Sequence, residues 1–312
     1  MRIYIQKVPN FIIFDYLTNT IYNILNKKYN CTILLDLKNV VLNNDDILIM
    51  VPQFCWNFIN CIDKKKHNIK IFLINTEPIY KGKIFDLNLF DHVSLYTNKK
   101  INIFDYAINN VLFVKKSNIY LTNNFNIDFL PWTYNSYIET FIKYNEEIKD
   151  IDILFIGWIP NNSRREKMYK EFINKNKDKN YNYNIKFSNT NNNCNDVIFN
   201  YKLFSRAKII IHIFNYEDVK IFDFYRFTIL LSNKLFFITE DFDEISNNYI
   251  TNYKDHLIYS PYDNFVDFVF NNLKTMSDNE RQKIANRNYE WYKNLSNYDE
   301  IFEKMFIKNI NL

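Results

Sequence analysis

The sequence predicts an α/β protein built from two Rossmann-like domains that face a cleft. Short apolar runs rich in β-branched residues alternate with amphipathic segments, which is typical of parallel sheets with crossover helices. The chain has 312 residues and a mass of 38.1 kDa, which is long for one domain, and the alternation starts again near residue 151. A hydrophobic content of 47% is enough to fill two cores.

The first half of the chain contains the elements of one such domain. Its strands are expected at residues 3–6, 32–37, 47–51, 69–74 and 92–96. Crossover helices are expected at residues 11–25 and 54–63, and a later helix at 105–114 precedes a strand that ends near Trp132. Because crossovers between parallel strands are right-handed, these elements predict a doubly wound sheet.

The second half repeats the pattern. Strands are expected at residues 151–157, 185–187, 209–211, 235–239 and 256–260, and helices at 163–174, 220–232, 277–294 and 298–307. Ser277 and Glu280 have the spacing of a capping box, which fixes the start of one helix. We expect domains at residues 1–140 and 141–295, with a C-terminal helix in residues 296–312 that packs back on the first domain.

The composition argues against several classes of protein. The net charge is only +4 and its cations are spread along the chain, so we expect no nucleic-acid partner. Four cysteines without metal-site spacing indicate reduced thiols, and four histidines without a metal-binding motif predict no bound metal. The mean hydropathy of -0.33, with no long apolar run and no signal-peptide pattern, predicts a cytoplasmic protein without a transmembrane segment.

Polar side chains gather where the strands of the second half end. Tyr216 and Glu217 follow an apolar strand, Asp223 and Arg226 share one face of the next helix, and Glu240 ends the following strand. Ligands of open parallel sheets bind beyond the carboxyl ends of the strands. The segment from residue 207 to residue 244 therefore predicts a site for a nucleotide-type ligand.

A second candidate segment runs from Gly157 to Glu166, between a buried strand and a helix. Gly157 is one of only two glycines, so its backbone is expected to need conformational freedom or close approach. Ser163 is the expected helix cap, and Arg164 and Arg165 present forked donors beside a helix N-terminus, which suits phosphate oxygens. The alternative is a capped helix whose arginines face solvent.

Arg226, His212 and Glu77 each have two interpretations. Arg226 lies in an apolar helix, where it either pairs with Asp223 or turns toward a diphosphate. His212 ends an apolar strand and is either a hydrogen-bonded core residue or a ligand contact. Glu77 follows a buried strand and is either a turn cap or the base that deprotonates an acceptor hydroxyl. Asp105 is expected to compensate the dipole at the start of a helix.

Several segments resemble the glycosyltransferases of GT-B fold, in a group with bacterial and large-DNA-virus members. The resemblance is carried by DILFIG with Arg164 and Arg165 after it, and by SRAKIIIHIFNYEDVKIFDFYRFTILLSNK, which ends at Lys234. INTEP, DYAINN and FLPWTYN in the first half match more faintly. The chain departs from the group's pattern at four places. Trp158 replaces a small residue, His212 and Phe214 stand in an altered Asn-Ile-His run, and Asp223 replaces a glutamate. Asn233 replaces the glycine at the helix end and is expected to adopt the left-handed conformation of that glycine.

The resemblance implies a metal-independent glycosyltransferase that uses a nucleotide sugar as donor and has no other cofactor. The acceptor is a glycan, a protein or a lipid-linked chain. The first domain is implied to bind the acceptor, with Glu77 as base, and the second domain to bind the donor. The implied donor-binding residues are Gly157, Arg164, Arg165, His212, Tyr216, Asp223 and Arg226. The alternatives are a non-catalytic module that binds a glycan or a protein, and a nucleotide-sugar epimerase.

Overall fold

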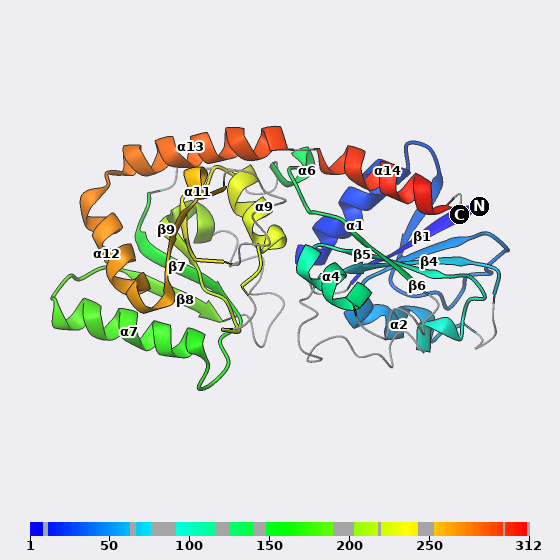
Figure 1. Cartoon of the computed structure of the whole chain (residues 1–312), viewed down its shortest axis with the longest axis horizontal. Helices are drawn as coiled ribbons and strands as arrows, with labels where there is room; N and C mark the ends of the chain where they lie inside the picture. The colour runs from blue at the N-terminus through cyan, green and yellow to red at the C-terminus, as the bar shows by residue number, and fades with distance from the viewer. Residues whose placement is uncertain are drawn as a thin grey trace. The chain divides into compact units, whose positions relative to one another are not determined.

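The structure of the chain, a computed structural model, consists of two compact units (Figure 1). Unit 1 comprises Met1–Trp132 and Asn297–Leu312, and unit 2 comprises Thr133–Ser296. The residues that the structure describes are 1–8, 12–62, 67–76, 92–116, 125–139, 148–189, 203–217, 220–242, 253–295 and 297–310. Each unit contains one parallel sheet with helices packed against it, so the predicted α/β class is confirmed.

Unit 1 is built on a six-stranded parallel sheet in the order β2-β1-β3-β4-β5-β6. Its strands are β1 (Arg2–Gln6), β2 (Asn30–Leu34), β3 (Ile47–Met50), β4 (Lys70–Asn75), β5 (Ile101–Asp105) and β6 (Phe125–Phe129). Every residue of β3 and β5 is buried, as expected for strands covered by helices on both faces.

Helices cover both faces of this sheet. They are α1 (Ile12–Leu25), the 3₁₀ turn η1 (Pro52–Phe54), α2 (Cys55–Ile59), α4 (Ile108–Lys116) and α14 (Tyr298–Ile310). The C-terminal α14 belongs to this unit, because its Phe306 packs 4.9 Å from Phe72 of β4 and its Phe302 lies 6.1 Å from Phe104 of β5. Helices α2 and α4 pack with the opposite face, where Leu73 lies.

Unit 2 is built on a five-stranded parallel sheet in the order β11-β10-β9-β7-β8. Its strands are β7 (Ile151–Gly157), β8 (Ile185–Asn189), β9 (Ala207–His212), β10 (Phe237–Glu240) and β11 (Ile258–Ser260). The strand order reverses between β7 and β9, which makes their carboxyl ends the topological switch point where such sheets bind ligands.

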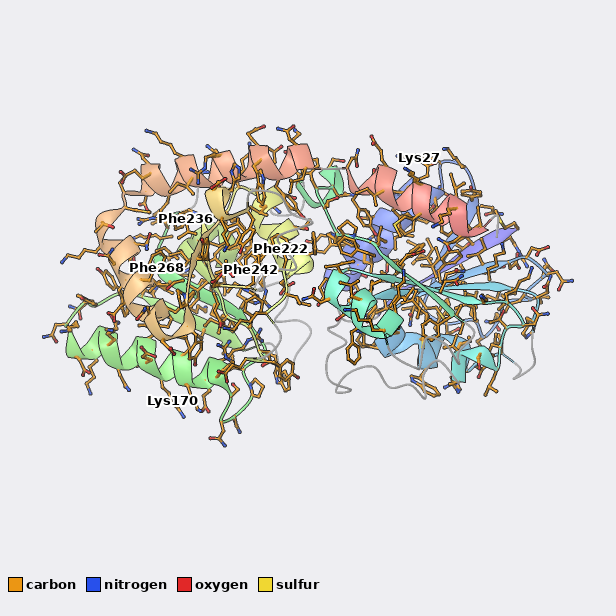
Figure 2. All side chains as sticks on the ribbon, viewed as in Figure 1. Lys27, Lys170, Phe222, Phe236, Phe242 and Phe268 are labelled. Carbon is orange, nitrogen blue, oxygen red and sulfur yellow. The ribbon has the colours of Figure 1, made fainter. Side chains whose placement is uncertain are left out.

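The helices of unit 2 complete a second core. They are α6 (Ser136–Glu139), α7 (Arg164–Asp178), α9 (Phe224–Ser232), α11 (Tyr253–His256), the 3₁₀ turn η2 (Tyr262–Asn264), α12 (Phe265–Thr275) and α13 (Asp278–Leu295). Helices α7 and α12 pack on the face that carries Phe155. Helix α9 packs on the other face, where its Phe227 stacks 5.2 Å from Phe237. Buried phenylalanines such as Phe222 and Phe242 fill the interior near α9 (Figure 2).

Most predicted elements are present, including the capping box of α13. There the Glu280 N–H donates to Ser277 Oγ at 3.3 Å, and the Ser277 N–H donates to the Glu280 carboxylate at 2.7 Å. The expected left-handed conformation of Asn233 is wrong, because Asn233 has φ -105° and the next residue, Lys234, has φ 53°. The chain reaches the left-handed region one residue later than the pattern indicated.

Three predictions about elements are also wrong. Residues 92–94 are helical and a turn follows at residues 95–96, where the Leu95 N–H donates to the His92 carbonyl, so the segment is not a strand. The strand of that region is β5, which was not predicted, and Asp105 ends it while α4 begins three residues later. Helix α12 was also missed. A short apolar run does not distinguish a strand from a buried turn, and here the tertiary packing decides.

Candidate functional site

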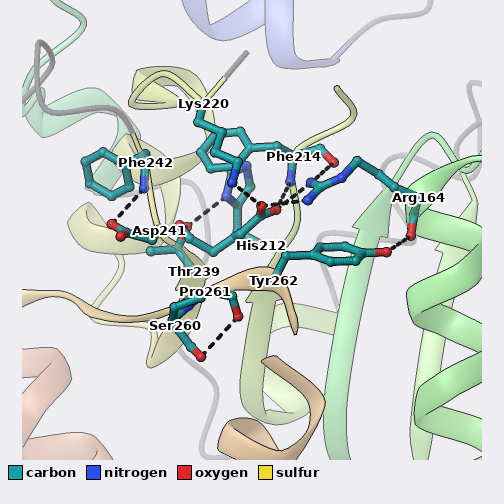
Figure 3. A network of polar contacts seen from close by, with 11 residues as sticks. Arg164, His212, Phe214, Lys220, Thr239, Asp241, Phe242, Ser260, Pro261 and Tyr262 are labelled. Carbon is teal, nitrogen blue, oxygen red and sulfur yellow. Dashed lines mark hydrogen bonds and ion pairs between the residues drawn. The ribbon is translucent and has the colours of Figure 1, made fainter. Parts of the chain in front are cut away.

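The carboxyl ends of three neighbouring strands in unit 2 carry the candidate site. Gly157 ends β7, His212 ends β9 and Glu240 ends β10, and the loop from β9 to α9 adds polar groups. Figure 3 shows Arg164, His212 and Lys220 in one network of polar contacts at this edge. Parallel packing brings residues that are distant in sequence to one edge of the sheet.

Glu240 is the centre of this network. It is fully buried, and its carboxylate accepts two hydrogen bonds from Arg164, at 2.6 and 2.7 Å. The Phe214 N–H donates to it at 3.2 Å, and the Lys220 Nζ lies 3.4 Å away. Arg164 also donates to the Phe214 carbonyl at 3.0 Å and lies 4.0 Å over the ring of Tyr262 (Figure 3). The guanidinium of Arg164 is therefore held by the protein itself.

Arg165 is buried and bound to backbone carbonyls. Its Nε donates to the Ile213 carbonyl and its Nη1 to the Trp158 carbonyl, both at 2.9 Å. Burial lowers the pKa of Arg165 to about 9, and the positive charge of Arg226 acts in the same direction. Arg165 therefore ties the loop after β7 to the end of β9.

Arg226 differs from both of these arginines. Within the described residues, its Nη1 is buried and has no hydrogen-bond partner, although buried donors in proteins almost always have one. Its Nε lies 3.9 Å from the Asp223 carboxylate, and its Nη2 lies 3.3 Å from the position that a side-chain carbon on Gly157 would occupy. Gly157 thus lets a guanidinium with an unused donor approach the backbone at the end of β7.

His212 and Asp223 form a pair beside Arg226. The Nδ1 of His212 lies 3.0 Å from Thr239 Oγ1, and its Nε2 lies 3.4 Å from Asp223 Oδ2. Burial lowers the pKa of His212 to about 4, although the hydrogen bond to Asp223 opposes this shift. Burial would raise the pKa of Asp223, but His212 and Arg226 hold it well below its usual range. At neutral pH the pair is a neutral imidazole and a carboxylate.

Two helices that start at this edge, α7 and α9, are capped by their own side chains. Ser163 Oγ accepts the Glu166 N–H at 3.2 Å, which confirms the predicted cap of α7, and Glu166 accepts the Asn162 N–H at 2.6 Å. Asp223 Oδ1 accepts the Arg226 N–H at 3.1 Å at the start of α9. These caps use some of the free N–H groups that an anion could otherwise bind.

Six of the predicted donor-binding residues lie at this edge, and they are Gly157, Arg164, Arg165, His212, Asp223 and Arg226. Tyr216 is half-buried in the loop between β9 and α9. Glu77 lies outside the described residues. The contacts of Lys220 and Tyr262 were not predicted, and the acidic end of β10 was the only signal for the central role of Glu240.

The carboxyl ends of the strands in unit 1 carry a buried polar cluster, formed by residues of the INTEP and DYAINN segments. Asp105, which is fully buried, accepts hydrogen bonds from Asn75 Nδ2 at 2.7 Å, Asn110 Nδ2 at 3.0 Å and the Ala107 N–H at 2.8 Å. Burial raises the pKa of Asp105 to about 7, although these hydrogen bonds oppose the shift. Asp105 thus joins the ends of β4 and β5 to α4.

The described part of the chain contains neither a metal-binding cluster nor a membrane-spanning helix. No group of three or more histidine, cysteine, aspartate or glutamate side chains there could hold a metal ion. None of the helices described has the length and apolar character that crossing a bilayer requires.

Comparison with known proteins gave matches among solved structures alone. No protein-family model and no curated protein matches the chain. The structure is similar to that of T4 phage BGT in complex with UDP and Mn²⁺, with 15% identity, a TM-score of 0.52 and all of both chains covered. It is also similar to a mutant of S. aureus TarM in complex with fondaparinux, α-GlcNAc-glycerol and UDP, with 11% identity and a TM-score of 0.51. That match covers 88% of this chain and 57% of TarM.

These structures are glycosyltransferases of GT-B fold, from a bacterium and a phage. At such low identity the likeness concerns the fold, and it agrees with the two parallel sheets and their helices. The chain therefore has the GT-B fold.

Proposed function

We propose that the chain is a glycosyltransferase that transfers a sugar from a nucleotide-sugar donor to a hydroxyl group of a glycan, protein or lipid-linked acceptor. The main support is Arg226, which lies beside Gly157 at the switch point of unit 2 and whose buried Nη1 has no partner among the described residues. A diphosphate oxygen is a suitable partner, because a guanidinium binds phosphate with two parallel hydrogen bonds. The GT-B fold makes a nucleotide diphosphate the ligand class to test first.

The charges of the site favour an anionic ligand. Among its described side chains, the carboxylates of Asp223 and Glu240 face the four cations Arg164, Arg165, Lys220 and Arg226. Within this group of six interacting side chains the cations exceed the carboxylates by two. Arg165 and Arg226 both lie near the ring of Phe155, where their mutual repulsion is relieved when an anion binds.

In the proposed reaction the bond between the sugar and the diphosphate breaks, and the leaving diphosphate gains negative charge. Arg226 contacts that diphosphate, and Arg164 and Arg165 hold the surrounding loops and add positive potential. The ionised Asp223, oriented by His212, accepts a hydrogen bond from a hydroxyl of the sugar or the ribose, and Tyr216 contacts the same part of the donor. Glu77 takes the proton of the acceptor hydroxyl.

Ligand binding is the first test. Thermal unfolding is measured with inorganic pyrophosphate and with UDP, GDP, ADP and their glucose conjugates, and affinities follow by calorimetry. Arg226→Ala is expected to weaken binding by about 10- to 100-fold, the range for a hydrogen bond to a charged group. Arg206→Ala is the control, because Arg206 pairs with Asp150 before β9 and β7, at the opposite edge of the same sheet. Equal affinity of Arg226→Ala and wild type would refute the assignment.

Turnover distinguishes the proposed enzyme from its alternatives. Slow hydrolysis of the bound nucleotide sugar without acceptor supports a transferase, whereas isomerisation of the sugar indicates an epimerase. If no nucleotide stabilises the chain, a binding module is the better hypothesis. Glu77→Gln is expected to retain nucleotide affinity and to lose transfer.

We also propose that the transfer reaction needs no metal ion, because cationic side chains can balance the charge of the diphosphate. Turnover is then the same in EDTA and in Mn²⁺. If EDTA abolished turnover and Mn²⁺ restored it, metal independence would be contradicted. The assignment of the diphosphate site would not be affected.

A further inference from the structure

Glu240 links three separate segments at the edge of the sheet in unit 2. Arg164 comes from the start of α7, the Phe214 N–H from the end of β9, and Lys220 from the loop that leads into α9. Each contacts the same carboxylate, which the strand β10 holds in place (Figure 3). The carboxylate is fully buried and its two oxygens receive these donors, so it is not placed to bind a ligand directly.

We propose that Glu240 is a positioning residue, which fixes the loop between β9 and α9 in the conformation that binds the diphosphate. This inference rests on the proposed function, because the loop and α9 carry Tyr216, Asp223 and Arg226. Without the carboxylate, the Phe214 N–H loses its acceptor, and Arg164 and Lys220 become uncompensated cations beside each other.

A second set of contacts connects Glu240 with the His212–Asp223 pair. Thr239, the residue before Glu240, contacts Nδ1 of His212 at 3.0 Å. The ring of Phe214, whose N–H binds Glu240, meets the His212 ring edge-on at 4.7 Å. A shift at the end of β10 therefore changes the position of His212 and, through it, that of Asp223.

A buried ion pair can also have a purely structural role, and a matched pair in the same sheet provides the control. Asp152 and Lys208 pair at 2.7 Å near the amino ends of β7 and β9, with side chains 15% and 29% exposed. Removal of the carboxylate charge of Glu240 or of Asp152 is expected to destabilise unit 2. Only the loss of Glu240 is expected to change the opposite edge of the sheet, where the ligand binds.

The experiment measures inorganic pyrophosphate binding by calorimetry, at a temperature where every variant is folded. Glu240→Gln is expected to weaken binding at least tenfold, Glu240→Asp to recover part of the loss because it keeps the charge, and Asp152→Asn to bind like wild type. Hydrogen exchange across residues 213–217 is expected to accelerate in Glu240→Gln alone.

Each other outcome overturns the proposal. Unchanged affinity in Glu240→Gln makes Glu240 structural, and tighter binding means that Glu240 competes with the anion for Arg164 and Lys220. If Glu240→Gln does not fold, Arg164→Lys tests the same contact, because lysine keeps the charge and lacks the fork; wild-type affinity in Arg164→Lys refutes the inference. If the wild-type protein binds neither pyrophosphate nor any nucleotide, the proposed function is refuted as well. That outcome differs from failure of the Glu240 inference alone, in which the wild-type protein still binds.

Discussion

The Nε2 atom of His212 lies 3.4 Å from Oδ2 of Asp223, and His212 is only 1% exposed. Burial lowers the pKa of this histidine to about 4, so the imidazole is neutral at physiological pH, and its Nε2 atom faces the carboxylate. The same oxygen, Oδ2, also faces Arg226, whose Nε lies 3.9 Å away, so both side chains orient the carboxylate. A buried aromatic shell made by Phe214 and Phe227 surrounds the imidazole.

This pair predicts that unit 2 loses stability in mild acid. An unfolded histidine has a pKa of about 6.5, so between about pH 6.5 and 4 the unfolded chain binds a proton that the folded chain does not. The contribution of His212 is therefore present above pH 6.5 and is lost as the pH falls toward 4, by about 3 kcal/mol at most. Urea unfolding of the wild type and of His212→Gln between pH 4 and 7 measures this pH-dependent loss of stability.

His212→Gln keeps an amide donor near Asp223 and cannot gain a proton. Its stability is expected to fall less than that of wild type over the same pH interval. Parallel curves for the two proteins would mean that other groups cause the acid sensitivity.

Gly157→Ala is expected to weaken the proposed site through Arg226. The added carbon would lie 3.0 Å from Phe155 Cζ and 3.3 Å from Arg226 Nη2, which is tighter than ordinary contact, so both side chains must shift slightly. Phe155 is fully buried, so its shift costs stability, and the shift of Arg226 moves the guanidinium that carries the unused donor. We expect a loss of about 1–2 kcal/mol in stability, typical of overpacking, and weaker pyrophosphate binding.

A double-mutant cycle tests this explanation. If Gly157→Ala acts through Arg226, its effect on pyrophosphate affinity disappears in an Arg226→Ala background. Additive effects would show that the glycine acts independently of the arginine.

The strands were more predictable than the turns between them. The strand β7 has the predicted bounds, because an apolar run buried on both faces ends there at a glycine. The segment at residues 92–96 is also partly apolar, but it forms a helical turn whose His92 packs beside Trp56 and Asn60. The local sequence pattern contains no information about such neighbours. The strand was therefore expected at residues 92–96, and β5 was missed.

The candidate site was predictable as a set of residues but not as a set of contacts. Proximity in sequence placed Asp223 beside Arg226, and the structure adds that Asp223 caps the helix. Arg164 and Glu240 are 76 residues apart, so their bidentate pair depends on the order of strands in the sheet. Sequence spacing therefore could not show which arginine keeps an unused donor.

Asp105 predicts a pH dependence of the opposite sign in unit 1. Burial raises its pKa to about 7, above the value of about 3.9 for an unfolded aspartate. Between these values the folded chain binds a proton that the unfolded chain lacks, so stability is greatest below pH 4 and falls as the pH rises through 7. The difference is on the order of 4 kcal/mol at most.

Urea unfolding of wild type and Asp105→Asn between pH 5 and 8 isolates this effect. The variant is expected to lose stability at every pH, since its amide faces the amides of Asn75 and Asn110, but to show a smaller decrease between pH 5 and 8. An unchanged slope would assign the decrease to another group.

The end of α9 predicts a stabilising substitution. Lys234 has φ 53°, and the Leu235 N–H donates to the Leu230 carbonyl at 3.0 Å, as in a Schellman motif. A left-handed conformation costs a residue with a side chain about 1–2 kcal/mol, which glycine avoids. The Nζ of Lys234 lies 4.4 Å from the centre of the Tyr289 ring, and loss of this contact offsets about 0.5–1 kcal/mol of the gain.

Lys234→Gly is therefore expected to stabilise unit 2 by up to about 1 kcal/mol in thermal unfolding. Asn233→Gly is the matched control, because Asn233 has a negative φ and its Nδ2 donates to the Ile229 carbonyl at 2.8 Å. That substitution removes a buried hydrogen bond without relieving strain, so it is expected to destabilise. If both glycines had the same effect, the left-handed conformation of Lys234 would not be the cause.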